Sequence, residues 1–159
     1  MSASIPASGS TFPFVPPDPH YAERVRASFA RQGAMKTLGA ELVAVEPGYC
    51  AIALLPRPEV SQQHGYVHAG VVSAIADSAG GFAGFTLFPA NASVLTVEFK
   101  LNLLAPASGD RLVAEGFVVK PGRTLAITRG EVHAEHHGRR KLVAIMQQTL
   151  MVMHGKADE

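Results

Sequence analysis

The hydrophobic residues of this chain follow two different periods, and the change between them lies near Pro89. Residues 69–88 (AGVVSAIADSAGGFAGFTLF) are mostly apolar or small, and their apolar positions cover every side of a helix. Such a helix must be enclosed on all sides, by protein or by lipid. Its single acidic residue, Asp77, is costly to bury alone, so we expect Asp77 to have either a partner or a chemical task.

After Pro89 the apolar and polar residues alternate, which is typical of strands with one buried face. The breaks in this alternation are the glycine-bearing turn sequences PASGD, PGR and HHGRR. The pattern predicts a four-stranded antiparallel meander with strands at Ser93–Leu104, Arg111–Lys120, Thr124–Glu135 and Lys141–Met153.

Before the apolar helix, the sequence predicts a short amphipathic helix and a hairpin. The helix spans Asp18–Gln32, with Asp18 as its N-cap, a proline at its first position and Gly33 just past its end. The turn sequence EPG joins two strand-like segments, Thr37–Val45 and Tyr49–Leu55. Residues 61–67 predict a loop that leads into the long helix.

These elements favour a single α+β domain over residues 18–159. Residues 1–17 are rich in Pro and Ser and predict an extended, poorly ordered lead, without the basic start and apolar core of a targeting signal. Six strands and one enclosed helix fit a curved antiparallel sheet that wraps around the helix. The many small residues of the helix would let this sheet approach the helix backbone closely.

Composition narrows the classes of partner. Hydrophobic residues make up 47% and charged residues 17%, and a net charge of +1 with scattered Lys and Arg predicts no nucleic-acid partner. Residues 69–88 are long enough for a membrane span, but Asp77 near their middle and the weakly hydrophobic Ala and Gly predict no membrane partner. The single cysteine, Cys50, suits a reducing cytoplasm, and its strand-like context predicts a buried, unreactive thiol.

The sequence gives little support for a metal site, a phosphate-binding site or a serine nucleophile. His64 and His68 have the spacing of two metal ligands with Asp77 as a third, but Gly65 indicates a loop rather than a helix there. The histidines of HAEHHGRR lie in a predicted turn beside two arginines, which favours a solvated surface. The sequence contains neither a serine in a GxSxG motif nor a glycine-rich loop between a strand and a helix.

The start of the long helix offers another kind of chemistry. Backbone N–H groups near Ala69 and Gly70 would be unpaired donors at the positive end of the helix, where they could hold a developing oxyanion. Asp77 lies eight residues beyond Ala69, about 12 Å along a helix, which is too far to share one reacting atom. Two antiparallel helices meeting across a dimer axis would bring the groups together. A structural role of Asp77 in a dimer contact explains the residue equally well.

The sequence resembles the hotdog-fold acyl-CoA thioesterases, specifically their phenylacetic-acid-degradation (PaaI-like) branch. The resemblance spans roughly residues 35–153 and rests on three segments in the family's order: HGYVHAGVVSAIADSAGGFAG, VLTVEFKLNLLAPASGD and KPGRTLAITRGEV. It implies a curved six-stranded antiparallel sheet around one helix and hydrolysis of acyl-CoA without metal or organic cofactor. It also implies a homodimer that assembles into a homotetramer.

The resemblance assigns catalytic roles to five residues. Asp77 matches the acid that acts as nucleophile or as general base toward water. Ala69 matches the residue whose N–H polarises the thioester carbonyl, and His68 matches the histidine before it. Gln62 matches the Asn or Gln that orients the carbonyl or the water, and Thr96 matches a Ser or Thr that positions the water.

Substrate contacts are assigned more loosely. Gly70 lies at the helix start, and Arg123 and Thr124 lie in the turn that in related enzymes contacts the nucleotide part of CoA. Two positions depart from the family: Ala69 stands where Gly is usual and adds a methyl group near the thioester, and Gly81 has no hydroxyl where some relatives use Thr. The acyl group therefore stays open among aromatic, short-chain and medium-chain acids.

Two other functions are alternatives to hydrolysis. A hotdog dehydratase or hydratase needs a histidine and an acid poised at the acyl chain, and its sequence contexts are missing here. A non-catalytic acyl-CoA binding or sensing domain would normally be fused to a DNA-binding segment, for which the N-terminal helix is too short. The presence of Asp77, Gln62 and Thr96 favours an enzyme.

Overall fold

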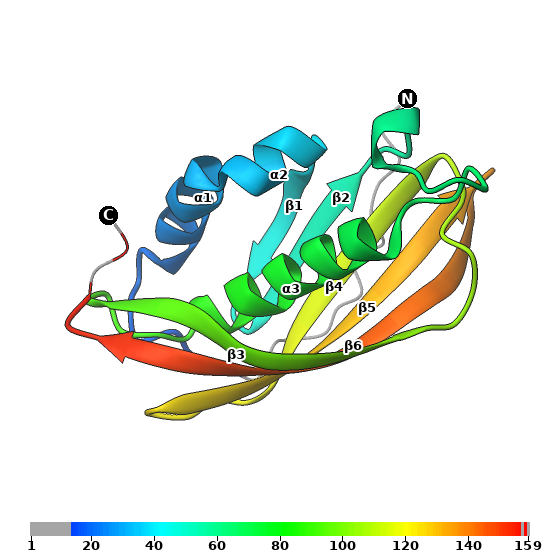
Figure 1. The fold of residues 1–159 in the computed structure, drawn as a ribbon. Helices are drawn as coiled ribbons and strands as arrows, with labels where there is room; N and C mark the ends of the chain where they lie inside the picture. Colours follow the sequence, from blue (N-terminus) through cyan, green and yellow to red (C-terminus); the bar gives the residue numbers. More distant parts are fainter. Residues whose placement is uncertain (1–13, 157, 159) are drawn as a thin grey trace.

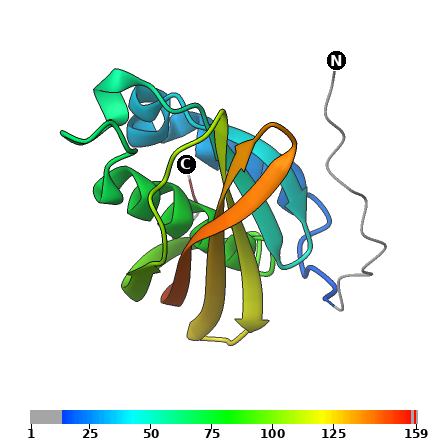
Figure 2. The same ribbon diagram turned by 90° about the vertical axis from the view of Figure 1, so that its right-hand side faces the viewer.

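A curved six-stranded sheet holds one long helix on its inner side (Figures 1 and 2). The computed structural model describes residues 14–156 and residue 158. All neighbouring strands are antiparallel, in the order β1-β2-β4-β5-β6-β3. The elements are α1 (Tyr21–Arg31), α2 (Gly33–Leu38), β1 (Glu41–Glu46), β2 (Tyr49–Leu54), a 3-10 turn (Pro58–Val60), α3 (Ala69–Phe85), β3 (Ala92–Leu103), β4 (Arg111–Lys120), β5 (Leu125–His136) and β6 (Arg139–His154).

The predicted architecture is confirmed: six antiparallel strands curve around the apolar helix. The predicted strand over Thr37–Val45 is wrong in its first part, because residues 33–38 form α2 and the strand begins at Glu41. Gly39 adopts a left-handed conformation (φ 68°) and ends α2, which Met35 anchors in the core. Gly33 accordingly opens α2 instead of merely following α1. The extended lead predicted over residues 1–17 falls mostly on residues 1–13, which lie outside the described part.

Helix α1 also begins later than predicted, at Tyr21, although Asp18 still shapes its start. The Asp18 carboxylate accepts a hydrogen bond from the His20 N–H (2.9 Å) and pairs with Arg24 at 3.0 Å. The Arg24 guanidinium in turn donates to four carbonyl oxygens around the end of α3, those of Phe85, Phe88, Pro89 and Ala92. This largely buried ion pair therefore ties α1 to the C-terminal end of α3.

Small residues allow α3 to lie directly on the sheet. A Cβ atom at Gly116 of β4 would lie 2.2 Å from the Ala79 carbonyl oxygen, and one at Gly84 would lie 2.4 Å from Leu150. The helix and sheet backbones therefore meet at Gly116, and at Gly84 the Leu150 side chain packs against the helix backbone. Ile75 and Phe85 of α3 are fully buried in the same core. No helix within residues 14–156 is long and apolar enough to cross a membrane.

Strand β3 forms one edge of the sheet and carries a bulge. Its pairing with β6 passes from Thr96↔Leu150 to Glu98↔Thr149, so Val97 is the extra residue. Val94 and Leu101 both pack on the core although they are seven residues apart, which regular alternation would not allow. The bulge therefore places Thr96 on the same side of the sheet as Phe99 and Leu101, which is the side on which α3 lies.

The inner side of the sheet is only partly covered by α3. The helix packs mainly on β2, β4 and β5 and makes fewer contacts with β6. Phe99 pairs with the buried Gln148 and so faces the inner side, yet its side chain is 43% exposed. Leu103, four residues on, is 54% exposed. An apolar strip thus remains open on the inner side of the edge strand β3.

Candidate functional site

Asp77 lies in the third turn of α3, where its carboxylate is held by two side chains of the sheet. Its Oδ1 accepts a hydrogen bond from the Thr96 hydroxyl at 2.8 Å and another from Gln148 Nε2 at 2.5 Å. Thr96 stands on β3 directly before the bulge, and Gln148 stands on β6. Asp77 and Thr96 line a pocket of about 320 Å³, completed by Gln32, Ser78, Gly81, Phe82, Val94 and Leu95. The acid that the sequence singles out therefore has partners and also faces an open pocket.

Gln148 and Thr128 belong to this cluster, and sequence reasoning missed both. The Gln148 side chain is 1% exposed, and its Oε1 accepts a hydrogen bond from the buried Thr128 hydroxyl at 2.8 Å. Its Nε2 also lies 3.2 Å from Thr96 Oγ1 and from the Asp77 carbonyl oxygen. The sequence contains a sign of the role of Gln148, because this polar residue falls between Met146 and Leu150 on the inward face of a predicted strand. A polar side chain at such a position needs a partner.

The start of α3 forms a second, separate group. His68 is the N-cap residue, and its Nδ1 accepts a hydrogen bond from the Gly70 N–H at 2.9 Å. The expectation of an unpaired N–H at Gly70 is therefore wrong. The Ala69 N–H, in contrast, has no acceptor among the residues that the structure describes. The positive end of the helix thus offers a donor at Ala69.

The loop before α3 places Gln62 beside this donor. The Gln62 N–H donates to the Tyr66 carbonyl at 2.8 Å, and the Gln62 side-chain oxygen accepts from the His64 N–H. Gln62, His68 and Ala69 line one pocket of about 500 Å³, and its other wall includes Leu103 and Pro106. Because the side-chain oxygen of Gln62 is occupied, its amide NH₂ remains as the donor toward a ligand.

Within one chain, the structure does not bring the two groups together. Asp77 and Ala69 are eight residues apart on α3, about 12 Å along the axis. Their pockets share none of the described residues. Arg123 and Thr124 lie in the turn between β4 and β5 and line neither pocket. Their carbonyl oxygens accept hydrogen bonds from His154 Nε2 and the Val152 N–H, which fixes the turn against β6.

The histidines do not form a metal-binding cluster in the described part of the chain. Over residues 14–156, no three His, Cys, Asp or Glu side chains are grouped so as to hold a metal ion. His68 is engaged with Gly70, and His136 lies 3.1 Å from the Asp110 carboxylate at the β5–β6 turn. The weak metal pattern of His64 and His68 is thus not reproduced in space.

Comparison with known proteins shows the family. Residues 64–141 match the thioesterase superfamily. A solved structure of a thioesterase family protein from Silicibacter pomeroyi is 46% identical, covers 85% of this chain and 99% of its own, and superposes with a TM-score of 0.83. The chain belongs to the thioesterase superfamily. The matched region includes His68, Ala69 and Asp77, whereas Gln62 and Gln148 lie outside it.

Two further relatives of this thioesterase-superfamily chain extend the comparison. The 1,4-dihydroxy-2-naphthoyl-CoA hydrolase of Listeria monocytogenes is 26% identical over 120 residues, which are 76% of this chain and 95% of that protein. The PaaI protein of the Escherichia coli phenylacetic acid degradation operon is 18% identical, covers 86% of this chain and 96% of its own, and superposes with a TM-score of 0.78. The predicted resemblance to hotdog thioesterases is confirmed.

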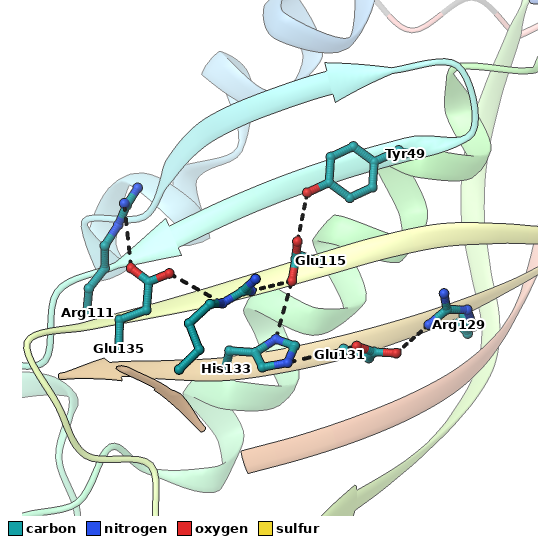
Figure 3. Close-up of polar contacts among 8 residues, drawn as sticks. Tyr49, Arg111, Glu115, Arg129, Glu131, His133 and Glu135 are labelled. Carbon is teal, nitrogen blue, oxygen red and sulfur yellow. Dashed lines mark hydrogen bonds and ion pairs between the residues drawn. The ribbon is translucent and has the colours of Figure 1, made fainter. Parts of the chain in front are cut away.

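The opposite face of the sheet carries a separate polar network (Figure 3). Its centre is Glu115, which accepts a hydrogen bond from the Tyr49 hydroxyl at 2.9 Å and pairs with Arg140 at 2.5 Å. His133 Nδ1 lies 3.3 Å from the same carboxylate. Burial, together with the Glu115 carboxylate, raises the pKa of the Tyr49 phenol. The ion pairs continue through Glu131, Arg129, Glu135 and Arg111.

This polar network is a poorer candidate for the reacting site than the inner side of the sheet. The network lines a hollow of about 590 Å³, but its carboxylates and cations are paired with one another. The hollow also lies across the sheet from α3, away from the helix start and from Asp77. The inner side of the sheet therefore holds the better candidate for chemistry on a thioester.

Proposed function

We propose that this protein hydrolyses an acyl-CoA thioester to the free acid and CoA at sites shared between two protomers. The observation that carries the proposal is the state of Asp77: a carboxylate in an open pocket, with Oδ1 hydrogen-bonded and Oδ2 without a partner among the described residues. Such an oxygen can take a proton from water or attack a carbonyl carbon. Membership of the thioesterase superfamily and the similarity to a naphthoyl-CoA hydrolase support the substrate class.

The Ala69 N–H supplies the second requirement of acyl transfer. An unpaired N–H at the positive end of a helix stabilises negative charge on the carbonyl oxygen as it develops. The Gln62 amide NH₂ lines the same pocket and provides a further donor for the carbonyl or the water. With Nδ1 of His68 occupied by the Gly70 N–H, the neutral imidazole carries its proton on Nε2, which makes that atom a donor as well.

The reaction balances with one water molecule and no other reactant. In the general-base route, Asp77 takes a proton from water, the oxygen bonds to the thioester carbon, and the charge on the carbonyl oxygen is held by the Ala69 N–H. The carbonyl re-forms as the carbon–sulfur bond breaks, and the sulfur leaves with the electron pair as CoA thiolate. The proton on Asp77 then passes to the thiolate or to solvent, which restores the carboxylate. In the nucleophilic route, Asp77 attacks the carbonyl carbon, the carbon–sulfur bond breaks and CoA thiolate leaves, and water then cleaves the resulting mixed anhydride to the free acid and the Asp77 carboxylate. Both routes give the same products.

A second copy of the chain would unite the two groups. The open apolar strip of β3, with Phe99 and Leu103 exposed, offers a surface that a second copy would bury. A two-fold axis there would set the two α3 helices antiparallel, so that Asp77 of one protomer faces Ala69 of the other. Assembly of such dimers into a homotetramer, and contact of CoA with Gly70, Arg123 and Thr124, remain predictions from the family resemblance.

The deciding experiment measures CoA release from phenylacetyl-, hydroxybenzoyl- and straight-chain acyl-CoAs by the wild type and by Asp77→Asn. We expect one acyl class to turn over and the variant to lose about a hundredfold or more in kcat/KM while its melting temperature stays near that of the wild type. If no thioester is hydrolysed but an acyl-CoA still raises the melting temperature, the protein is a binding domain and the proposal is wrong.

A further inference from the structure

We infer that Gln148 is a positioning residue for the reaction proposed above, and that it selects Oδ2 as the reacting oxygen of Asp77. The inference rests on the proposed function and goes beyond the family resemblance, which assigned no role to β6. The Gln148 side chain touches Asp77, Thr96 and Thr128, and it does so from a fully buried position.

The orientation of the Gln148 carboxamide follows from its two neighbours. An ionised carboxylate can only accept hydrogen bonds, so the NH₂ end of the amide must face Asp77 and the oxygen must face away. The Thr128 hydroxyl then donates to that oxygen at 2.8 Å. Turning the amide over would place its oxygen against the carboxylate oxygen, which is repulsive. Thr128 and Asp77 thus hold the amide in a single orientation.

Gly80 makes room for this arrangement within α3. A Cβ atom at Gly80 would lie 2.2 Å from Gln148 Oε1 and 3.1 Å from Thr128 Oγ1. Glycine in the middle of a helix costs roughly 0.5–1 kcal/mol relative to alanine, so its presence needs a reason. The close approach of the carboxamide to the helix backbone supplies that reason.

The two carboxylate oxygens of Asp77 therefore differ in their hydrogen bonding. Oδ1 accepts from both Gln148 and Thr96, which fixes the rotation of the carboxylate. Over residues 14–156, Oδ2 has no hydrogen-bond partner, so it is the oxygen left to act on water or on the thioester carbon. The Thr96 hydroxyl proton is already used on Asp77, which assigns Thr96 to holding the acid. Reacting groups held in one geometry lower the barrier because less ordering is needed during the reaction.

The first test compares Gln148→Met with Gln147→Met. Methionine keeps the length of the side chain and removes its N–H donor, and Gln147 is the exposed neighbour on the other face of β6. We expect Gln148→Met to lower kcat about 10- to 100-fold with KM changed less than about twofold. Gln147→Met should stay within about twofold of the wild type in both constants. Melting temperatures establish that both variants are folded.

The second test uses Gln148→Glu, which restores a donor only when the introduced carboxyl is protonated. Among the described residues, the side chains that hydrogen-bond to Gln148 are Asp77, Thr96 and Thr128, and of these only Asp77 titrates. Burial and the Asp77 charge raise the pKa of the introduced carboxyl, by up to several units. Below that pKa its O–H can donate to Asp77 as the amide does, and above it two carboxylates repel each other. Relative to the wild type, kcat/KM should therefore fall as pH rises between about 6 and 9.

The outcomes separate this inference from the proposed function. If Gln148→Met keeps kcat within about twofold of the wild type while Asp77→Asn is inactive, Gln148 has no positioning role and the hydrolase proposal stands. If Gln148→Met does not fold, Gln148→Glu decides, and a pH profile parallel to that of the wild type overturns the inference. If Asp77→Asn is as active as the wild type, the proposed function itself fails.

Discussion

Gly80 of α3 lies so close to Gln148 of β6 that a Cβ atom on the glycine would stand 2.2 Å from the carboxamide oxygen. The next residue, Gly81, differs sharply, because a Cβ atom there would meet nothing within 4 Å. Two neighbouring glycines in one helix therefore have different reasons to be present. Gly80 accommodates a buried polar side chain, and Gly81 leaves open space beside Asp77 in its pocket.

This contrast predicts opposite effects of alanine at the two positions. Gly80→Ala forces Gln148 to move and should destabilise the fold by about 1–3 kcal/mol, as overpacking of a core does. It should also lower kcat, because the donor to Asp77 is displaced. Gly81→Ala meets no obstruction and should raise stability by roughly 0.5–1 kcal/mol. Urea unfolding of the two variants checks both signs, and equal effects would contradict the packing argument.

The sequence was sufficient to predict the fold because periodicity reports burial. Alternation along β5 and β6 marked strands with one buried face, and the apolar run around Asp77 marked a helix enclosed by them. The segment before β1 is an exception, because Thr37 and Leu38 suit a strand by composition but belong to a helix. Tertiary packing of Met35 and the left-handed Gly39 make that segment a short helix instead.

The candidate site was only partly predictable, for two physical reasons. The contact of Thr96 with Asp77 depends on the bulge at Val97, and one extra residue in a strand leaves no clear mark on a sequence pattern. The contact of Gln148 with Asp77 joins residues 71 positions apart and follows only from the strand order. The inward position of Gln148 could nevertheless be read from the alternation of β6.

The buried ion pair of Arg24 and Asp18 predicts a large loss of stability when it is broken. Arg24→Leu leaves the Asp18 carboxylate, only 7% exposed, without its cation and removes donors from four carbonyl oxygens at the end of α3. We expect a loss of about 3–5 kcal/mol in the free energy of unfolding. Arg26→Leu removes the same charge from an exposed position of α1 and should change stability by less than about 0.5 kcal/mol.

Chemical denaturation of the two arginine variants measures this difference directly. A loss below about 1 kcal/mol for Arg24→Leu would show that water or neighbouring groups satisfy Asp18 and the helix end, and would contradict the assigned role. If Arg26→Leu loses as much free energy of unfolding as Arg24→Leu, the cause is the changed net charge of the protein rather than the loss of the Arg24 contacts.

The thiol of Cys50 should react with thiol reagents only when the protein unfolds. Its side chain is fully buried in β2, and burial raises the pKa of its thiol, so the reactive thiolate is scarce in the folded protein. A thiol reagent such as DTNB should leave the native protein unmodified for hours and modify one thiol per chain in denaturant. Rapid reaction of the native protein would contradict the burial of Cys50. Cys50→Ser should leave kcat/KM within about twofold, because Cys50 lines neither inner pocket.

The division of the site between Asp77 and Ala69 predicts complementation between two inactive variants. Ala69 is the first residue of α3, where proline is tolerated, so Ala69→Pro removes one backbone N–H without breaking the helix. We expect Ala69→Pro and Asp77→Asn each to lose about a hundredfold or more in kcat. If each site takes Asp77 from one protomer and Ala69 from the other, a mixed dimer contains one intact site and one site with both defects.

Co-unfolding and refolding the two variants in equal amounts makes half of the dimers mixed, so about a quarter of the wild-type activity should return. The control is a mixture of the two folded proteins assayed before subunits exchange, which should stay inactive. Ala69→Ser, which keeps the N–H, should retain most of the activity and shows that the lost donor, rather than a changed side chain, is responsible. If the refolded mixture stays as inactive as its components while dimers form, each site is built within one chain, and the shared-site geometry is wrong.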